Sequence, residues 1–322
     1  MLFPIMFYNL ENLYDTINDP LTDDADFTPT GIKRWDNFKY RTKLECLGEV
    51  FSAVSKLPGG FPAVVGVSEV ENDTVLEDLV SVKMMSGGNY HYIHYESNDA
   101  RGVDVAMLFS PDRFKLMGSE PVKLVLRSGR EYIGRDILAA WGLLDGEMFV
   151  FYVCHFLSRR TGTDASQGFR RAGAETVRDH AKAMRLKYPG IKVVVMGDMN
   201  DTPSDDSLAM LLGAKRKMKE VTGEGYFNPM WQLMEEGIGS SMHNHKWMMF
   251  DNFIVSHNLL PGNSAKGFHL TKTDKIHWAE VFSRNFMMDR GQPRRSYNGD
   301  HFQKGYSDHL PILIRLEKQS EK

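Results

Sequence analysis

Several short apolar runs in this sequence end in polar side chains of the types found in active sites, and they limit the folds that the chain can adopt. Residues 2–10, 61–67, 147–156 and 191–196 are such runs, rich in Val, Ile, Phe and Tyr. Apolar runs of this length indicate buried β-strands. Polar residues at the ends of buried strands are natural positions for a functional site. The pattern therefore predicts a protein built on sheets, with its chemistry at strand ends.

Helical spacing of apolar residues predicts helices at 35–57, 72–85 and 167–186, with a short one at 205–212. Further strands are predicted at 90–95, 103–109, 114–126, 131–143 and 310–316, and a hairpin region at 226–255. Residues 256–306 are polar and rich in Pro and Gly, which predicts a surface excursion. We find no repeat or linker and expect one domain over residues 1–322. Mixed strand order favours an α/β (α+β) fold with two sheets packed face to face and helices outside.

Composition limits the class of protein. With 322 residues, of which 42% are hydrophobic, and a net charge of −3, the chain is predicted to be globular and without a strong pull toward polyphosphate backbones. No apolar run is long enough to span a membrane. The amino terminus lacks a leader pattern, so we expect either a cytoplasmic protein or one exported by a leader outside these residues. A monomer is favoured, and Cys46 and Cys154 are predicted to be buried free thiols.

The sharpest motif is Gly197-Asp198-Met199-Asn200, which directly follows an apolar strand. A carboxylate there can bind a metal or move a proton. The amide of Asn200 can hold an anionic oxygen without adding negative charge. For the next residue, Asp201, a role in the turn is the favoured interpretation.

A second acidic motif, Ser307-Asp308-His309, stands directly before the last apolar strand. Neighbouring residues of an extended chain face opposite ways, so Asp308 and His309 are expected to have separate roles, toward metal and substrate. Asp251 begins another strand, and a buried aspartate needs a partner. We predict that His309 is this partner, because a carboxylate fixes the imidazole tautomer and raises its basicity.

Residues 64–72 form another strand that ends in carboxylates. Glu69 is the metal candidate, and Glu71 is expected to be a charge at a helix amino terminus. The same segment nearly matches the nucleophile elbow of serine hydrolases at Ser68, although Val70 stands where glycine is needed. A serine hydrolase using Ser68 therefore remains a rival hypothesis.

Two further strand ends, Asn9-Leu10-Glu11 and His155-Phe156-Leu157-Ser158-Arg159, carry polar groups. Arg159 could clamp a phosphate, with a solvated surface arginine as the alternative. The short basic clusters at 127–135, 159–160, 170–171, 215–219 and 294–295 are mostly predicted to be solvated surface. His243 and His245 lie at a predicted hairpin tip and are interpreted as surface histidines.

Taken in order, these motifs resemble the series found in the endonuclease/exonuclease/phosphatase superfamily. The resemblance runs from residue 9 to residue 309, and six motifs in the right order make it specific. It implies a four-layer sandwich, with two mixed β-sheets between helices and the site at one edge of the sheets.

The resemblance also implies site roles. Glu69 would bind Mg²⁺ or Mn²⁺, with Glu11 and Asp308 near it. The chemistry of these oxygen ligands independently suits a hard cation. The phosphate would be held by Asn9, His155 and Asn200.

Proton transfer would fall to His309 paired with Asp251, with Asp198 beside the attacking water. We assign His309 as the base. In-line attack by water would be assisted by the metal, which neutralises charge on the phosphoryl oxygens. Arg101 and Asp104 stand where family members often carry a tyrosine or asparagine near the phosphate. They are expected to take that place, with Arg101 toward the phosphate, and this departure leaves the substrate class open.

The leading hypothesis is therefore a metal-dependent hydrolase of phosphodiester bonds, with nucleic acid as one candidate substrate. A phosphatase acting on a small, inositol or lipid-borne phosphate through the same site is the alternative. A binding protein without turnover is a further alternative, and the combination of metal, base and phosphate-holding residues argues against it.

Overall fold

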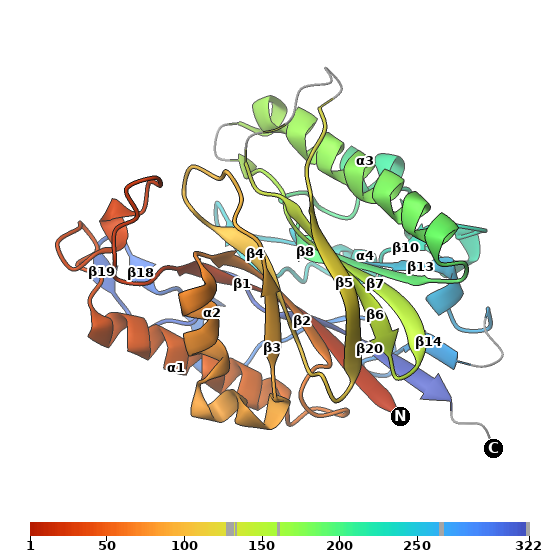
Figure 1. The fold of residues 1–322 in the computed structure, drawn as a ribbon, viewed down its shortest axis with the longest axis horizontal. Coiled ribbons are helices and arrows are strands. Elements are labelled where there is room, and N and C mark those ends of the chain that lie inside the picture. The colour runs from red at the N-terminus through yellow and green to blue at the C-terminus, as the bar shows by residue number, and fades with distance from the viewer. Residues whose placement is uncertain (127–131, 133, 160–161, 264–266, 320–322) are drawn as a thin grey trace.

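Two seven-stranded sheets packed face to face form the centre of the computed structural model, which describes residues 1–126, 132, 134–159, 162–263 and 267–319. Helices α1 (Asn37–Val54) and α2 (Asp73–Val80) lie on the outer face of the first sheet. Helix α3 (Thr163–Lys187) covers the outer face of the second sheet (Figure 1). The expected four-layer sandwich is confirmed.

The first sheet has the strand order β14-β20-β1-β2-β4-β3, with β15 pairing with β20. Strand β1 runs parallel to β2 and antiparallel to β20, which brings the two ends of the chain into one sheet. Its strands are β1 (Leu2–Leu13), β2 (Val64–Val70), β3 (His91–His94), β4 (Asp104–Phe109), β14 (Gly267–Thr271), β15 (Glu280–Val281) and β20 (Ile312–Gln319).

The second sheet has the order β5-β6-β7-β8-β13-β10-β9. Strand β8 runs parallel to β7 and antiparallel to β13. Its strands are β5 (Phe114–Val122), β6 (Ile137–Leu144), β7 (Glu147–His155), β8 (Lys192–Asp198), β9 (Ala214–Lys215), β10 (Tyr226–Phe227) and β13 (Asp251–Ser256).

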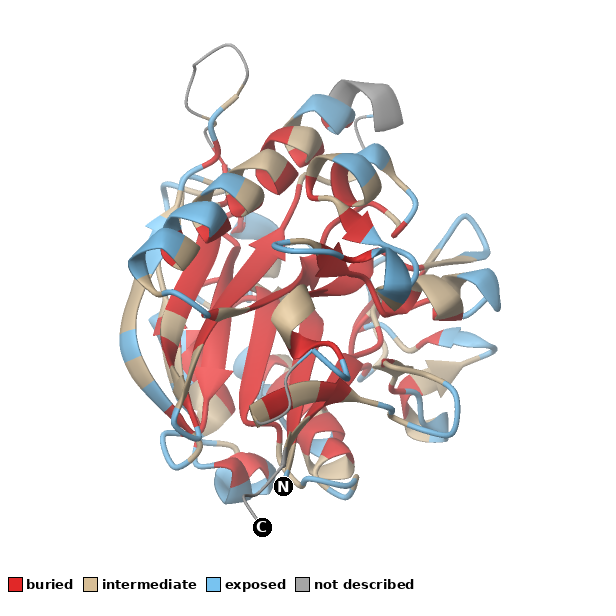
Figure 2. Ribbon diagram, turned by 90° about the vertical axis from the view of Figure 1, so that its right-hand side faces the viewer, coloured by how far each residue is buried: buried red, intermediate tan, exposed pale blue. Residues whose placement is uncertain are grey.

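Alternating side chains of the strands fill three separate cores. In β1, Ile5 and Phe7 point between the two sheets, whereas Met6 and Tyr8 point toward α1 and α2. In β8, likewise, alternate residues face the other sheet or α3. Both faces of these strands are therefore buried, which explains their continuous apolar runs. Figure 2 shows the buried strands at the centre and the exposed residues on loops and outer helix faces.

Helix starts follow ordinary capping chemistry. The side chain of Asp36 accepts a hydrogen bond from the Lys39 amide at the start of α1, and Asn72 does the same for Val75 at α2.

The helices predicted at 35–57 and 167–186 are confirmed. The helix predicted at 72–85 divides into α2 and a 3-10 segment, Lys83–Gly88. No helix of the described part of the chain is long and apolar enough to cross a membrane.

Three expectations need correction. The short helix predicted at 205–212 is a π-helical turn, Ser207–Leu211. The 226–255 region is only partly a hairpin, because helix α4 (Met230–Glu235) precedes the hairpin of β11 (Ser241–His243) and β12 (Lys246–Met248). The 256–306 excursion contributes β14 and β15 to the first sheet. The rest includes two small hairpins: β16 (Met288–Asp289) with β17 (Gln292–Pro293), and β18 (Tyr297–Asn298) with β19 (His301–Phe302).

Candidate active site

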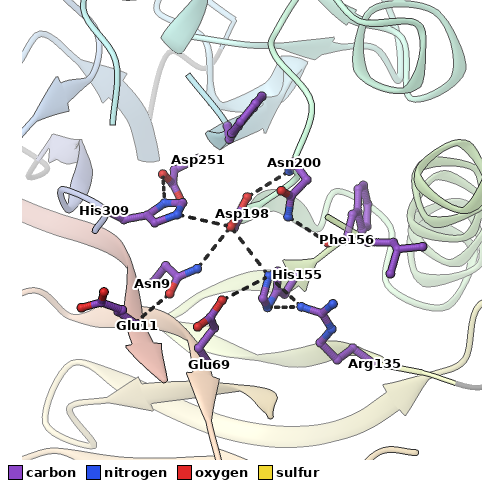
Figure 3. Close-up of polar contacts among 12 residues, drawn as sticks. Asn9, Glu11, Glu69, Arg135, His155, Phe156, Asp198, Asn200, Asp251 and His309 are labelled. Carbon is purple, nitrogen blue, oxygen red and sulfur yellow. Dashed lines mark hydrogen bonds and ion pairs between the residues drawn. The ribbon is translucent and has the colours of Figure 1, made fainter. Parts of the chain in front are cut away.

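The polar strand ends meet at one edge of the sandwich. Strand register places Asn9 opposite Ser68, the residue before Glu69, in the first sheet. In the second sheet, Asp198 is flanked by His155 on one side and Asp251 on the other. Figure 3 shows the side chains from both sheets converging, with Asp198 at the centre. Together with His309, which contacts Asp198 and Asp251, six of the segments singled out in the sequence therefore meet in space.

The backbone leaves ordinary strand geometry at these ends. Glu11, Asn12, Glu69 and Asn200 all adopt positive φ, between 48° and 61°. The β1–β2 and β2–β4 registers shift at the same places. Non-glycine residues in the left-handed region carry backbone strain, which surrounding structure must hold in place. These bends redirect the acidic side chains out of the pleat.

Asp198 is the hub of the cluster. Its Oδ1 accepts a hydrogen bond of 2.9 Å from the Asn200 amide, and its Oδ2 accepts one of 3.2 Å from Asn9 Nδ2. The same Oδ2 lies 3.7 Å from Nε2 of His309 and 3.7 Å from Nε2 of His155. Burial raises the pKa of Asp198 to about 7; the charge on Asp251 also raises it and His309 opposes the rise.

His309 and Asp251 form the predicted pair. Nδ1 of His309 donates to Oδ2 of Asp251 over 2.7 Å, and Asp251 is 1% exposed. Burial alone would lower the pKa of His309, but Asp251 and Asp198 raise it well above its usual value. Ser240, which precedes β11 and was not identified from the sequence, also donates to Oδ2 of Asp251. The carboxylate is thus fixed from two sides and turns Nε2 of the imidazole toward Asp198.

His155 packs against Arg135, which belongs to a cluster expected at the surface. Arg135 is 6% exposed, and its Nη1 lies 2.6 Å and 2.7 Å from the two ring nitrogens of His155. Burial and the charge of Arg135 hold the pKa of His155 well below its usual value. Because a guanidinium can only donate, the contact requires a neutral ring. The surface expectation is thus wrong for Arg135; Arg127 and Arg130 of the same cluster lie outside the described residues.

Glu69 has the chemistry that a hard cation needs. Burial alone would raise its pKa, but Arg101 and other nearby cations hold the pKa well below the usual range, so the carboxylate stays ionised. Its Oε2 accepts from the Asn12 amide at 2.9 Å and lies 3.4 Å from Arg101. Within the described chain no hydrogen bond reaches Oε1, whose nearest ionic neighbour is His155 Nε2 at 3.9 Å. A partly buried, ionised carboxylate oxygen without a donor fits a divalent cation.

The other two predicted metal ligands are already engaged. Arg295, assigned to the surface from sequence, contacts Glu11 Oε1 through Nε at 3.1 Å and Asp308 Oδ2 through Nη2 at 2.9 Å. Glu11 Oε2 also accepts from the Ser296 amide at 2.7 Å. Across the described residues, the carboxylates of Glu69, Glu11 and Asp308 are not within 4.8 Å of one another as a group. The convergence expected from the resemblance is therefore not reached with Arg295 in this position.

Arg159 has a different role from the two that the sequence suggested. It borders the pocket, but its Nε donates to the Asn200 carbonyl at 2.6 Å and its Nη2 lies 2.6 Å from Asp201 and 2.7 Å from Asp205. Arg170, also placed on the surface from sequence, is 1% exposed and pairs with the same Asp201. These arginines hold the turn after β8 rather than a phosphate.

The serine-hydrolase rival is contradicted. Ser68 is completely buried inside β2, and its Oγ has no hydrogen-bond partner among the described residues. A nucleophilic serine needs a base within hydrogen-bond reach and an exposed oxygen. Glu71 lies directly before Asn72, which caps the amino terminus of α2, as expected for a charge at a helix start; it is 6% exposed and accepts a 2.6 Å hydrogen bond from the Asp15 amide.

A pocket of about 290 Å³ opens over this cluster. His243 reaches it from the β11–β12 hairpin, and so does Met242. Arg101 and Arg135 also line the pocket, and unlike Arg159 they are not bound to the turn after β8. The remaining lining includes Glu69, Asp99, His155, Asp198, Asn200, Phe250, Asp308 and His309.

This architecture and donor set define a hydrolase class: a two-sheet sandwich whose strand ends gather carboxylates, amides and a carboxylate–imidazole pair suited to phosphate esters and a divalent metal. The sequence profile of the Endonuclease/Exonuclease/phosphatase family matches residues 4–318, and the chain belongs to this family. It is therefore a divalent-metal-dependent phosphoester hydrolase. No curated protein sequence matches the chain significantly.

Solved structures share the fold across almost the whole chain. The mannosyl-6-phosphatase of Bacteroides thetaiotaomicron has 16% identity and a TM-score of 0.58, with 98% of this chain and 99% of that chain covered. The catalytic domain of human Nocturnin has 14% identity, a TM-score of 0.57 and coverages of 99% and 95%. D. rerio TDP2, complexed with a single-strand DNA product, has 14% identity, a TM-score of 0.53 and coverages of 98% and 99%. At these identities the likeness establishes the fold.

Proposed function

We propose that the chain hydrolyses phosphodiester bonds by in-line attack of water, with Mg²⁺ or Mn²⁺ as the cofactor. The observation that carries this proposal is the directed arrangement of Asp251, His309 and Asp198. The imidazole is fixed by a buried carboxylate at 2.7 Å and faces a second carboxylate at 3.7 Å. Such an arrangement can orient a water and take its proton at a defined place.

In the proposed reaction, the water lies beside Nε2 of His309 and Oδ2 of Asp198. We assign the proton to Nε2 of His309, because Asp251 at 2.7 Å stabilises the imidazolium that forms. Since the pKa of His309 is raised, the neutral ring that takes the proton is populated only as pH rises toward that pKa. Asp198 orients the water in its ionised form. Since its pKa is raised to about 7, protonation below that pH removes this acceptor, and hydrolysis should decline on acidification.

The scissile phosphate is proposed to bind between the two sheets. Asn9 and Asn200 border this place from opposite sheets, and Arg135 and Arg101 bring positive charge to it. His155, whose pKa is lowered by burial and by Arg135, stays neutral and can donate a hydrogen bond without adding charge. We propose Glu69 as the main protein ligand of the metal, which when bound would neutralise phosphoryl charge and stabilise the leaving oxygen.

A second pocket beside the first favours a phosphodiester substrate over a phosphomonoester. A separate pocket of about 270 Å³ is lined by Glu11, Asn12, Lys33, Tyr297 and Arg295. The ion pair of Arg295 with Asp308 stands between it and the pocket over Asp198, because Arg295 borders one and Asp308 the other. A substrate with groups on both sides of phosphorus can occupy both pockets.

A phosphatase acting on a small or lipid-borne phosphate is the second candidate. The observation that favours it is the pairing of the surrounding cations: Arg159 and Arg170 are bound by Asp201, which leaves no continuous basic rim from them for a long polyanion. Arg101 and Arg135 would also suit a terminal dianionic phosphate.

The test is a substrate panel of phosphodiesters and phosphomonoesters, with Mg²⁺, with Mn²⁺ and with chelator, for the wild type, His309→Ala and Asp198→Asn. We expect metal-dependent cleavage of diesters by the wild type and a loss of about 100-fold or more in each variant. Circular dichroism controls for folding.

Three results would change the proposal. Chelator-insensitive turnover would remove the metal role, and unchanged rates in either variant would remove that residue's role. Turnover confined to monoesters, insensitive to salt and without retention of DNA or RNA, would replace the diesterase by the phosphatase.

A further inference from the structure

We propose that His94, Glu96 and Asp104 form a second metal site, specific for a divalent transition metal such as Zn²⁺, at the base of the loop that joins β3 to β4. One ligand atom from each residue lies within 4.8 Å of the other two. His94 ends β3 and Asp104 begins β4, so the neighbouring strands hold these two side chains in place. The site is separate from the active centre described above.

An unpartnered nitrogen points into this cluster. The side chain of His94 is 2% exposed, and its Nδ1 contacts Asp73 Oδ1 at 3.0 Å. Its Nε2 is buried and has no hydrogen-bond partner in the described structure, with Asp104 Oδ2 at 3.7 Å. That separation is too long for a hydrogen bond. Two atoms bound to one tetrahedral Zn²⁺ lie about 3.4 Å apart, from metal–ligand distances near 2.0–2.1 Å, so an ion between them fits the gap.

The remaining contacts fix the ligands as a metal site requires. Asp73 holds Nδ1 of His94, which leaves Nε2 as the ligand nitrogen. Ser97 donates to Asp104 through both its amide and its hydroxyl, which holds this buried carboxylate in place. Glu96 is exposed and can turn its carboxylate onto the ion, with water completing the coordination.

The competing explanation is an imidazolium clamped between Asp73 and Asp104. That arrangement would leave the Nε2–H of His94 buried without an acceptor at hydrogen-bond distance, which is costly. A metal ion explains the same arrangement, because it can bind the nitrogen lone pair and two carboxylate oxygens together. One imidazole among carboxylates selects Zn²⁺ and other transition metals over Mg²⁺.

The loop between β3 and β4 connects this second metal site to the active centre. Residues 97–103, between the ligands Glu96 and Asp104, carry Asp99 and Arg101 into the pocket. Asp99 Oδ2 lies 3.1 Å from Arg135 Nε, and Arg101 lies 3.4 Å from Glu69. An ion bound by Glu96 and Asp104 would tie both ends of this loop and hold the two arginines where the phosphate is expected.

The experiment measures Zn²⁺ binding by calorimetry and by metal content after desalting, on chelator-treated full-length protein. All variants carry Glu69→Gln, so that the ion of the active centre contributes as little as possible. We expect His94→Ala to lose one equivalent of bound Zn²⁺, and Glu96→Gln to weaken that site by about tenfold or more. His91→Ala, on the exposed side of the same strand, is the matched control and should bind as the parent does.

An unchanged stoichiometry in His94→Ala would overturn the proposal and leave the imidazolium clamp. If His94→Ala does not fold, Glu96→Gln decides, because its exposed carboxylate has no packing role: an unchanged Kd refutes the site. Thermal stability gives an independent readout, since Zn²⁺ should raise the melting temperature of the parent and of His91→Ala but not of His94→Ala.

Discussion

Arg295 occupies the place between two carboxylates that the family resemblance assigns to the neighbourhood of the metal. Its guanidinium bridges Glu11 and Asp308, and half of its side chain is exposed, so it can turn away without disturbing the core. Burial and the charge of Asp308 raise the pKa of Glu11, while Lys43 and Arg295 oppose this rise. A cation bound by Glu11 and Asp308, as proposed, would compete with Arg295 for the same oxygens.

We predict that Arg295→Ala binds Mn²⁺ about tenfold more tightly than the wild type, which corresponds to about 1.4 kcal/mol. The reason is that the metal no longer displaces a guanidinium from Glu11 and Asp308. Calorimetric titration measures the change, and Arg290→Ala, an exposed neighbour, controls for the loss of one positive charge. Weaker binding in Arg295→Ala would mean that Arg295 supports the metal site instead of blocking it.

Glu71 gives a pH-dependent prediction about stability. Burial raises the pKa of Glu71 to about 8, and the charges of Asp15 and Asp24 add to this although the Asp15 amide opposes it. A pKa above the unfolded value means that the protonated form stabilises the fold, and that this stability is lost as pH rises from about 4.5 through 8. Glu71→Gln keeps an acceptor for the Asp15 amide but never ionises.

We therefore expect Glu71→Gln to melt at a higher temperature than the wild type at pH 9, and at a similar temperature at pH 5. Thermal denaturation followed by circular dichroism at both values checks this. Equal melting temperatures at pH 9 would show that the Glu71 carboxylate is solvated when charged, contrary to its burial.

At the scale of elements, the β7–β8 pair decides whether Asp198 is in place. Gly197 precedes Asp198 in β8, and a Cβ built there would lie 2.1 Å from the carbonyl oxygen of Cys154 in β7. Real atoms cannot approach so closely, so the two strands would have to separate. The glycine in the motif is required by this close approach of the two backbones.

We predict that Gly197→Ala lowers the free energy of unfolding by about 2–3 kcal/mol or more and reduces hydrolysis with it. Gly168, in α3, has no atom within 4 Å of its built Cβ and serves as the matched control. Gly168→Ala should raise stability by about 0.5–1 kcal/mol, because alanine favours helix. Chemical denaturation compares the two, and a neutral Gly197→Ala would contradict the packing described here.

The elements predicted from sequence are those with a strong local pattern. The central strands of both large sheets and the helices α1 and α3 are predictable, because their apolar residues form buried runs or repeat at the period of a helix. Strand β14 and helix α4 were missed, because the first lies in a polar stretch and the second is only one and a half turns long. Tertiary contacts, not local pattern, determine such elements.

At the scale of the whole molecule, sequence alone could place the site only through polar residues at the ends of apolar strands. Asn9, Glu69, His155, Asp198 and Asp251 are predicted in this way. Arg135 and Ser240 are not, because neither belongs to a motif; their roles come from packing against His155 and Asp251. The left-handed turns at Glu11 and Glu69 are likewise invisible in sequence.

The first and last strands of the described chain, β1 and β20, pair with each other. The amino terminus donates a 2.9 Å hydrogen bond to the Lys318 carbonyl, and β1 pairs with β20 over six positions. The core between the sheets draws on residues from Phe3 to Leu316. A single domain over the whole chain stays a prediction, and this closed topology supports it. The same closure brings His309, directly before β20, to Asp198 and Asp251.

We propose that His309 and Asp198 act as one unit on one water, although they come from different sheets. The measurement is kcat/KM on a phosphodiester with saturating Mn²⁺ for the wild type, His309→Ala, Asp198→Asn and the double variant. If the two act together, the double variant will be no slower than the slower single variant, because either loss already disables the unit. Losses that multiply, or a single variant that keeps the wild-type rate, would show that the two residues work independently and would contradict the account.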